Sequence, residues 1–160
     1  MEQYLDKNKC LSGNPETADI VISVGRGIRD IRYFNKILKL ADMLNAQVVG
    51  TRPILDLGWI SRDREVGLSG LKIAPKICIT FGVSGANFHT MGLRGSNLII
   101  SVNNDKKANI FNIADYCVIK DVKSVIDKLC IDISKKRLKN TSDVVSFLLG
   151  YFDEYKINEI

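Results

Sequence analysis

The chain has 160 residues, of which 46% are hydrophobic and 26% are charged, and its formal net charge at pH 7 is +5. These values are those of an ordinary globular domain, and they exclude a disordered chain, which has too few apolar residues to form a core. The apolar runs have the length of strands and fall far short of the ~20 residues of a membrane span. We therefore expect a soluble protein without membrane insertion.

The positive charge is spread along the chain, and only residues 135–139 (KKRLK) concentrate it. A short basic run is usually a solvated helix face, and aromatic residues make up only 8% of the chain. Nucleic acid is therefore not the expected partner, because no basic stripe or RNA-binding signature accompanies the charge. An acidic cofactor or an acidic protein surface is compatible with it.

The cysteines and the single histidine predict no metal site. Cys10, Cys78, Cys117 and Cys130 have no CxxC spacing, and nothing in their arrangement indicates a disulfide framework. Free cysteines fit a reducing compartment, and the polar N-terminus MEQYLDKNKC has no apolar signal-peptide core. We therefore expect a cytoplasmic location.

The first half of the chain alternates between strand and helix patterns. Residues 1–17 are polar and are expected to form an N-terminal arm. Residues 18–24 (ADIVISV) predict a strand that is buried on both faces, and a tight turn follows at 25–27. Residues 31–44 have apolar positions at helical spacing, and residues 46–50 (AQVVG) predict a second strand.

The segment 51–76 is long and rich in glycine and proline, and it carries Trp59, the only tryptophan. Long irregular segments in compact domains are usually functional or disordered. We interpret this one as an ordered binding loop.

The second half continues the alternation. Three further strands are expected at 77–81, 98–102 and 116–119. A turn at 82–86 leads into a short helix to about Leu93, and further helices are expected at 122–133 and about 141–155. The alternation predicts an α/β fold with a three-layer, doubly wound parallel sheet of about five strands. Residues 18–134 are expected to form this domain, with residues 135–160 as a C-terminal helical extension.

Glycines and polar side chains follow the expected strands at the points where the strands end. They are Gly25-Arg26-Gly27, Thr51-Arg52, Val66-Gly67-Leu68-Ser69-Gly70, Ser84-Gly85-Ala86, Asn103 and Asp121. Ligands of parallel sheets bind outside these strand ends, so the sequence predicts a ligand site there. Glycine allows a phosphate to approach the backbone, and arginine neutralises phosphate or lies against an aromatic ring.

These residues alone do not identify the ligand. The turn after the first strand does not make the GxGxxG fingerprint of an ordinary dinucleotide site. His89 is the only histidine, and a lone histidine is more often a surface or core residue than a catalyst. No nucleophile motif or pair of acids supports hydrolytic chemistry.

The same residues form an ordered series of motifs that resembles the FAD-binding domain of the electron transfer flavoprotein alpha subunit, from Ala18 to about Ile133. The motifs are VGRG at 24–27, TRP and LDLGW within 51–59, VGLSG at 66–70, KIAPKICITFGVSGANFH at 72–89, SVNND at 101–105 and IFNIADYCVIKD at 110–121. The resemblance implies one FAD lying across the strand ends. It also implies electron transfer to and from partner proteins rather than the conversion of a substrate.

The resemblance also implies roles for individual residues. Arg26 approaches the cofactor, Thr51 takes the place of a family serine, and Arg52 lies by the flavin ring, where its charge favours the reduced cofactor. The residues expected beside the flavin and the ribityl chain are Val66, Gly67, Leu68 and Ser69. Those expected at the ribityl–pyrophosphate region are Ser84, Gly85, Ala86, Asn87, Phe88 and His89, with His89 also reaching the flavin O2 edge. Asn103, Asp121 and Val122 are expected at the adenosine end.

The chain departs from the family pattern at several positions. Leu68 stands where the family usually has glutamine, and Asn87-Phe88 replaces an Ile-Gln pair. The family's alpha subunit has another domain before this one, and residues 1–17 match only its connecting arm. The implied partners are the electron transfer flavoprotein beta subunit and a flavin dehydrogenase, and self-association is left open.

Two alternatives remain beside the electron carrier. One is a module that binds FAD or another nucleotide without redox turnover, and the other is a truncated interaction subunit. The resemblance places Gly85 close to the cofactor, so a Gly85→Val substitution is expected to block FAD uptake while leaving the fold intact.

Overall fold

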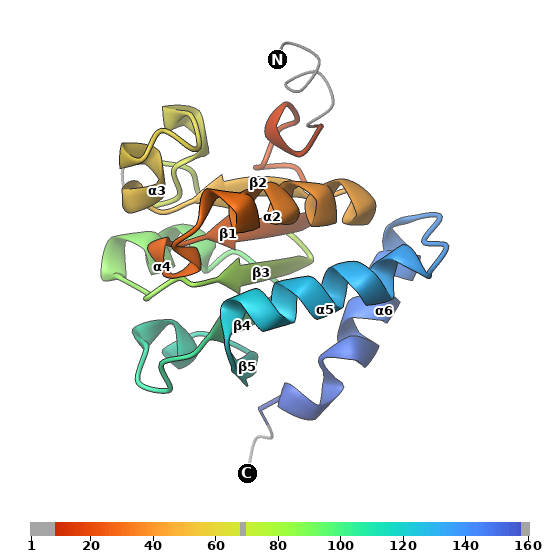
Figure 1. Ribbon diagram of the computed structural model, residues 1–160. Helices are drawn as coiled ribbons and strands as arrows, with labels where there is room; N and C mark the ends of the chain where they lie inside the picture. Colours follow the sequence, from red (N-terminus) through yellow and green to blue (C-terminus); the bar gives the residue numbers. More distant parts are fainter. Residues whose placement is uncertain (1–8, 68–69, 158–160) are drawn as a thin grey trace.

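Five strands form one parallel sheet with the order β2-β1-β3-β4-β5 (Figure 1). They are β1 (Ile20–Val24), β2 (Gln47–Gly50), β3 (Ile77–Phe81), β4 (Leu98–Asn103) and β5 (Tyr116–Ile119). All four neighbouring pairs are parallel. The computed structural model describes residues 9–67 and 70–157, without the side chains of Asn87 and Phe88. The expected α/β fold with a five-stranded parallel sheet is confirmed.

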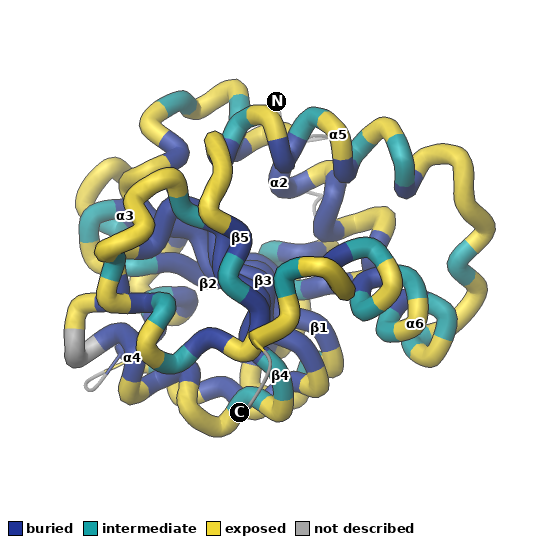
Figure 2. Tube along the Cα trace, turned by 90° about the horizontal axis from the view of Figure 1, so that it is seen from below, coloured by how far each residue is buried: buried dark blue, intermediate teal, exposed yellow. Residues whose placement is uncertain are grey.

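The central strands are covered on both faces, as the continuous apolar runs predict (Figure 2). On one face, Ile22 and Ile79 belong to a core cluster shared with the helices α2 (Ile31–Leu44) and α5 (Val122–Ser134). On the other face, Val21 and Cys78 belong to a second cluster with the helix α4 (Asn87–Leu93) and the short 3₁₀ helix η4 (Asn109–Asn112). The sheet is therefore the middle layer of three.

The two long helices on the first face begin at side-chain caps. The Asp30 carboxylate accepts a hydrogen bond from the Arg32 backbone N–H at the start of α2, and Asn45 ends this helix in the left-handed conformation (φ 54°). The Asp121 carboxylate caps α5 by accepting from the Ser124 N–H. Figure 1 shows α2 and α5 side by side in front of the strands. Both helices lie within about a residue of their expected bounds.

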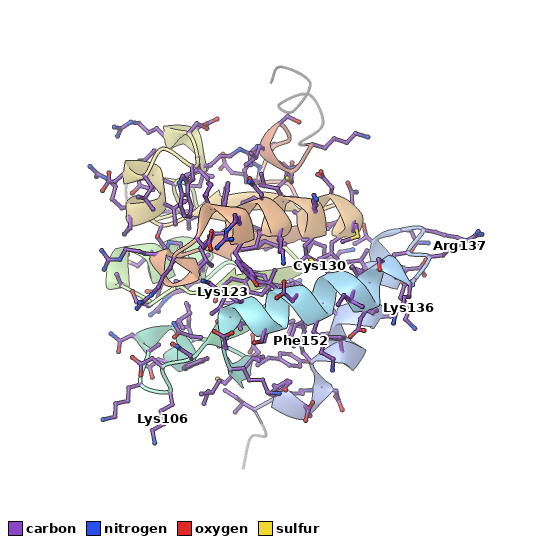
Figure 3. The ribbon with its side chains drawn as sticks, viewed as in Figure 1. Lys106, Lys123, Cys130, Lys136, Arg137 and Phe152 are labelled. Carbon is purple, nitrogen blue, oxygen red and sulfur yellow. The ribbon has the colours of Figure 1, made fainter. Side chains whose placement is uncertain are left out.

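The C-terminal segment returns to the sheet. Helix α6 (Thr141–Tyr151) begins at the Asn140 cap, and Phe152, which follows it, is only 1% exposed. The chain then forms the 3₁₀ helix η5 (Asp153–Tyr155) and an antiparallel bridge between Lys156 and Tyr116 at the start of β5. Between α5 and α6, the basic residues 135–139 are largely exposed, and Figure 3 shows Lys136 and Arg137 pointing away from the body.

The N-terminal arm packs against the other edge of the sheet from Lys9 onward. The 3₁₀ helix η1 (Lys9–Leu11) places Cys10 in the core, where burial raises the pKa of the thiol to about 12. The buried Arg64 guanidinium donates to the carbonyls of Cys10, Gly13 and Val48. The arm is thereby tied to strand β2.

The segment 51–76 is more regular than expected. It contains the helix α3 (Arg52–Asp56) and the 3₁₀ helix η3 (Arg62–Arg64). Helix α3 is too short to show a helical period in the sequence, and Pro53 sits in its first turn, where proline is tolerated. Trp59 packs on Phe34 with ring centroids 5.4 Å apart, which holds this part of the segment against helix α2.

Candidate functional site

The strand order creates a crevice between the carboxyl ends of β1 and β3. The helix α2 follows β1 on one face of the sheet, and α4 follows β3 on the other face. The segments that leave these two neighbouring strands therefore diverge at this point. In doubly wound sheets such a topological switch point is the place where ligands bind. The turn after β1 forms the 3₁₀ helix η2 (Arg26–Ile28) at one side of the crevice.

The glycines of the two turns allow their backbones to touch. Gly25 donates to the Phe81 carbonyl at 2.9 Å, and Gly27 donates to the Gly82 carbonyl at 3.0 Å. A Cβ atom on Gly25 would lie 2.4 Å from the Gly82 oxygen. Glycine is therefore required here for contact between the two turns at the floor of the crevice.

The crevice opens into a cleft of about 930 Å³. This volume is near the upper end of the range for small-molecule and cofactor sites. The expected site residues that line it are Arg26, Thr51, Arg52, Val66, Gly67, Ser84, Ala86, His89 and Asn103. Most of these lie just after the carboxyl ends of β1 to β4, while Val66 and Gly67 follow η3 and His89 lies in α4. The folding of the sheet therefore brings together residues that are far apart in the sequence.

The charge of the cleft comes mainly from arginines. Arg26, Arg29 and Arg52 line it together with the carboxylates of Glu65 and Asp105. Arg52 Nε donates to Asp56 Oδ1 at 2.9 Å, and this bond raises the pKa of Arg52 further. Neither Arg26 nor Arg29 makes an ion pair with another residue in the described part of the chain. These two cations are available to an anionic ligand.

Thr51 provides a polar atom that lacks a partner. Its Oγ1 is buried at the edge of the cleft and makes no hydrogen bond within the described residues. A buried hydroxyl without a partner is unfavourable, and a ligand that reaches it relieves this cost. The orphaned hydroxyl, the two unpaired arginines and the volume of the cleft all fit a large anionic ligand with hydrogen-bonding groups, such as FAD.

His89 lies in the first turns of α4 and is only 5% exposed. Its Nδ1 is 3.1 Å from the Val66 carbonyl, and its Nε2 is 3.1 Å from the Ser23 hydroxyl. Burial lowers the pKa of His89, while the bond to the Val66 carbonyl opposes this shift. Both ring nitrogens therefore have partners inside the protein, and the ring is neutral near pH 7.

Gly85 has a structural role that the sequence did not indicate. It does not line the cleft, and it adopts φ +93°, which disfavours any side chain. A Cβ atom there would lie 2.2 Å from the backbone nitrogen of Ile110. The expectation that Gly85→Val leaves the fold intact is therefore wrong, because valine would push η4 away from this turn.

The residues expected at the adenosine end lie in different surroundings. Asn103 lines the cleft, and its Nδ2 donates to the Val83 carbonyl at 2.9 Å, which fixes the turn after β3. Asp121 caps α5 and Val122 is buried in the core, and neither lines the cleft. Their contact with a ligand stays a prediction.

Four of the expected contacts involve side chains outside the described part of the structure. Leu68 and Ser69 lie outside the described residues, and of Asn87 and Phe88 only the backbone, in α4, is described. Their roles also stay predictions.

The structure adds residues that sequence reasoning missed. Arg29 and Leu57 form part of the cleft wall beside Trp59 of the expected binding loop, and the Ser23 hydroxyl contacts the His89 ring. Ser23 is a polar residue inside an otherwise apolar strand, and that pattern was the available signal. Its partner could not be found in this way, because it lies 66 positions further along the chain.

A doubly wound sheet with a cleft at its switch point defines a Rossmann-like α/β domain. Residues 15–94, half of the chain, match the family described as "Electron transfer flavoprotein FAD-binding domain". The chain belongs to this family.

Individual relatives agree with the family match. The chain is 42% identical over 122 residues to the electron transfer flavoprotein subunit alpha of Thermoanaerobacterium thermosaccharolyticum, covering 76% of this chain and 37% of the relative. It is 40% identical over 112 residues to Protein FixB of Azotobacter vinelandii, covering 70% of this chain and 31% of the relative. It is 38% identical over 120 residues to the mitochondrial electron transfer flavoprotein subunit alpha of Oryza sativa subsp. indica, covering 75% of this chain and 34% of the relative. The chain thus spans about a third of the length of the curated relatives it matches.

In residues 9–67 and 70–157, no helix has the length and apolar character needed to cross a bilayer. Among the same residues, no group of three or more His, Cys, Asp and Glu side chains is arranged to hold a metal ion.

Proposed function

We propose that this domain binds FAD in the cleft and serves as the cofactor-holding part of an electron carrier of the electron transfer flavoprotein type. The observation that carries the proposal is the position of the cleft. It lies at the β1/β3 switch point, and most of the residues that line it fall within the stretch that matches the FAD-binding family. Thr51 offers it a hydroxyl that has no hydrogen-bond partner within the described residues, and Arg26 and Arg29 offer it cations that have no ion-pair partner there. A bound flavin supplies reversible uptake and release of electrons.

The protein's own residues bind and orient the cofactor. Arg26 and Arg29 supply positive charge for the phosphates, and Thr51 supplies a hydroxyl with a free hydrogen-bonding capacity. Arg52, at the start of α3, lines the same cleft, and its charge would stabilise the negative charge that a bound flavin gains on reduction. Val66 and Gly67 line the same cleft.

The finer assignments follow the family resemblance. Val66, Gly67, Leu68 and Ser69 would lie along the flavin and the ribityl chain. Residues 84–89 would lie along the ribityl–pyrophosphate region, and Asn103, Asp121 and Val122 at the adenosine end.

We further propose a division of the chain and a set of partners. Residues 18–134 form the FAD-binding domain, with residues 1–17 as an arm and residues 135–160 as a helical extension. The proposed partners are an electron transfer flavoprotein beta subunit and a flavin dehydrogenase. Support comes from the relatives, whose names identify them as alpha subunits of such carriers. Homo-oligomerisation and a cytoplasmic location stay predictions from the sequence.

The test is a visible absorption spectrum of the purified chain, recorded after FAD has been added and the excess removed. We expect stoichiometric flavin bands that bleach on reduction and return in air. Arg26→Glu is expected to lose most of the flavin, whereas Arg62→Glu, on an exposed residue that does not line the cleft, is expected to retain it. A folded chain that retains no flavin would contradict binding by this domain alone. Retained flavin that cannot be cycled would favour a nucleotide-binding module without redox turnover.

A further inference from the structure

The guanidinium of Arg64 is buried and is held by neutral oxygen atoms. Its Nη1 donates to the carbonyls of Cys10 at 3.2 Å and Val48 at 2.9 Å. Its Nη2 donates to the carbonyl of Gly13 at 2.7 Å and to Gln47 Oε1 at 3.1 Å. No carboxylate in the described part of the chain forms an ion pair with it. The four terminal N–H groups thus have partners on the N-terminal arm and on β2.

Arg64 also stands directly before residues 65–67, which line the cleft. The Val66 N–H donates to the Gly50 carbonyl at 3.0 Å, and the carbonyl two positions earlier, that of Val48, accepts from the guanidinium of Arg64. Strand β2 is the outermost strand of the sheet, so the arginine and the Val66 N–H occupy alternate carbonyls along its open edge. The cleft-lining segment 65–67 is therefore attached to the same edge as the arm.

The arm and the buried arginine depend on each other. The Cys10 side chain is 1% exposed, and its N–H donates to Asp42 Oδ1 on α2 at 3.2 Å. If the arm left this place, Arg64 would lose two of its four acceptors, the carbonyls of Cys10 and Gly13. A buried cation without acceptors is strongly unfavourable. The guanidinium would then turn towards water, and the segment 65–67 would lose an anchor on β2.

We propose that Arg64 is a positioning residue that couples the N-terminal arm to the cleft. While the arm is docked, Arg64 holds the segment 65–67 along the edge of β2, and release of the arm loosens this side of the cleft. Coupling between two sites is reciprocal, so a ligand that binds the ordered cleft also keeps the arm docked. The identity of the ligand as FAD rests on the proposed function, whereas the coupling is a property of the free protein.

Hydrogen exchange of three backbone amides in the free protein measures the coupling. The Gly13 N–H, which donates to the Lys9 carbonyl at 3.3 Å, reports whether the arm is docked. The Val66 N–H reports the order of the segment 65–67. The Ile79 N–H, in the central strand β3, reports global unfolding. An amide that exchanges faster than Ile79 is released by a local opening.

Arg64→Met keeps a long side chain but removes the four donors. We expect the Gly13 and Val66 amides to exchange about tenfold faster or more in this variant, and each of them faster than Ile79. Arg62→Met is the matched control, because Arg62 is an exposed residue of the same 3₁₀ helix and does not line the cleft. We expect it to exchange as the wild type does.

A second pair of variants releases the arm without changing Arg64. The larger amide of Cys10→Gln does not fit the buried place of the thiol and should displace the arm, whereas Cys10→Ala fits and is the control. We expect Cys10→Gln to speed up the exchange of Val66 together with that of Gly13, and Cys10→Ala to stay close to the wild type.

Val66 exchange must follow Gly13 exchange in every variant. A released Gly13 amide with an unchanged Val66 amide, in Arg64→Met or in Cys10→Gln, would overturn the coupling. A Gly13 amide that stays protected in Arg64→Met would overturn the role of Arg64, as would an effect of equal size in the Arg62→Met control.

FAD supplies the reciprocal measurement. Couplings between sites typically change an affinity by about 5- to 150-fold, so saturating FAD should slow Gly13 exchange in the wild type by at least about fivefold. Arg64→Met should bind FAD more weakly by a similar factor. Bound FAD that leaves Gly13 exchange unchanged would overturn the link between the arm and the ligand. If neither the wild type nor any variant binds FAD, the proposed function fails, while exchange in the free protein still decides the role of Arg64.

Discussion

Arg52 and Asp56 form an ion pair across one turn of α3, with Arg52 Nε donating to Asp56 Oδ1 at 2.9 Å. Both side chains are more than half exposed, so the pair adds little to the stability of the fold. Its position matters more, because Arg52 lines the cleft and Asp56 sets the direction of the guanidinium. The carboxylate also offsets part of the positive charge that Arg52 offers to a ligand.

The first prediction concerns this charge. Arg52→Ala should make bound flavin harder to reduce, by about 1 kcal/mol per electron, the Coulomb energy of a charge at about 4 Å in water. Asp56→Asn should shift the midpoint potential the other way, because the offsetting charge is removed. Potentiometric titration of the FAD-loaded protein measures both. Arg62→Ala removes an exposed arginine that does not line the cleft and should leave the potential unchanged. Equal potentials in all four proteins would exclude Arg52 from the flavin's surroundings.

The second prediction compares two arginines of η3. Arg64 is 4% exposed and donates to the Cys10, Gly13 and Val48 carbonyls and to Gln47 Oε1, whereas Arg62 is exposed. Arg64→Ala leaves buried carbonyls unpaired and should lower the free energy of unfolding by about 3 kcal/mol. Arg62→Ala should change it by less than about 0.5 kcal/mol. Urea unfolding measures both, and similar values for the two would mean that the arm is not held by Arg64.

The third prediction concerns two glycines of opposite character. Gly85→Ala combines a positive φ with a Cβ atom 2.2 Å from the Ile110 nitrogen, so it should destabilise the fold by about 2 kcal/mol or more. Gly150 lies in α6 with nothing within 4 Å of an added Cβ. Gly150→Ala should therefore stabilise the fold by roughly 0.5–1 kcal/mol, because alanine is the better helix former. Thermal unfolding separates the two, and a stable Gly85→Ala would contradict the described turn.

The fourth prediction concerns the pH dependence of stability. Burial lowers the pKa of His89 in the folded protein, while the unfolded chain keeps the ordinary value near 6.5. Below pH about 6.5, His89 takes up a proton in the unfolded state but not in the folded state. The free energy of unfolding is therefore highest above this pH and decreases as the pH falls towards the lower pKa of the folded protein. The pKa of Asp30 is lowered to about 2, so the protonation of Asp30 affects the stability only at more acidic pH.

Urea unfolding at pH about 7.5 and about 5.5 measures this loss. His89→Gln should be less stable at both values but should show a smaller difference between them. A difference as large as that of the wild type would mean that another group causes the pH dependence.

The fifth prediction tests whether the C-terminal extension folds together with the sheet. Phe152 is 1% exposed and belongs to the core cluster of α2 and α5. Phe152→Ala should cost about 3–4 kcal/mol and should shift a single unfolding transition. Phe147→Ala, which changes a half-buried ring of the same helix region, should cost clearly less. Two separate transitions in the wild type would instead indicate that residues 135–160 fold on their own.

Much of the fold could be predicted because its elements have strong local signals. The strands 77–81 and 116–119 and the helix 31–44 lie where they were expected, since buried parallel strands give continuous apolar runs and Asp30 and Asn45 mark the ends of the helix. Helix α3 was missed because five residues are too few for a periodic pattern.

The site was predictable in position but not in its internal contacts. Strand ends identify where a ligand binds, so Arg26, Thr51 and Ser84 were found from the sequence and the family pattern. The Ser23–His89 contact and the approach of Ile110 to Gly85 join distant parts of the chain. Such contacts depend on tertiary packing, which a single sequence does not reveal.

The return of the C-terminal segment to β5 has a consequence for assembly. The Ile157 N–H donates to the Asp115 carbonyl at 2.9 Å, and Lys156 bridges to Tyr116, so backbone groups at the beginning of this edge strand are already paired. An exposed edge strand is a template on which another chain can add a strand and aggregate. By occupying the start of β5, the last described residues shorten this template, and the sheet is protected from growing into its neighbours at that edge.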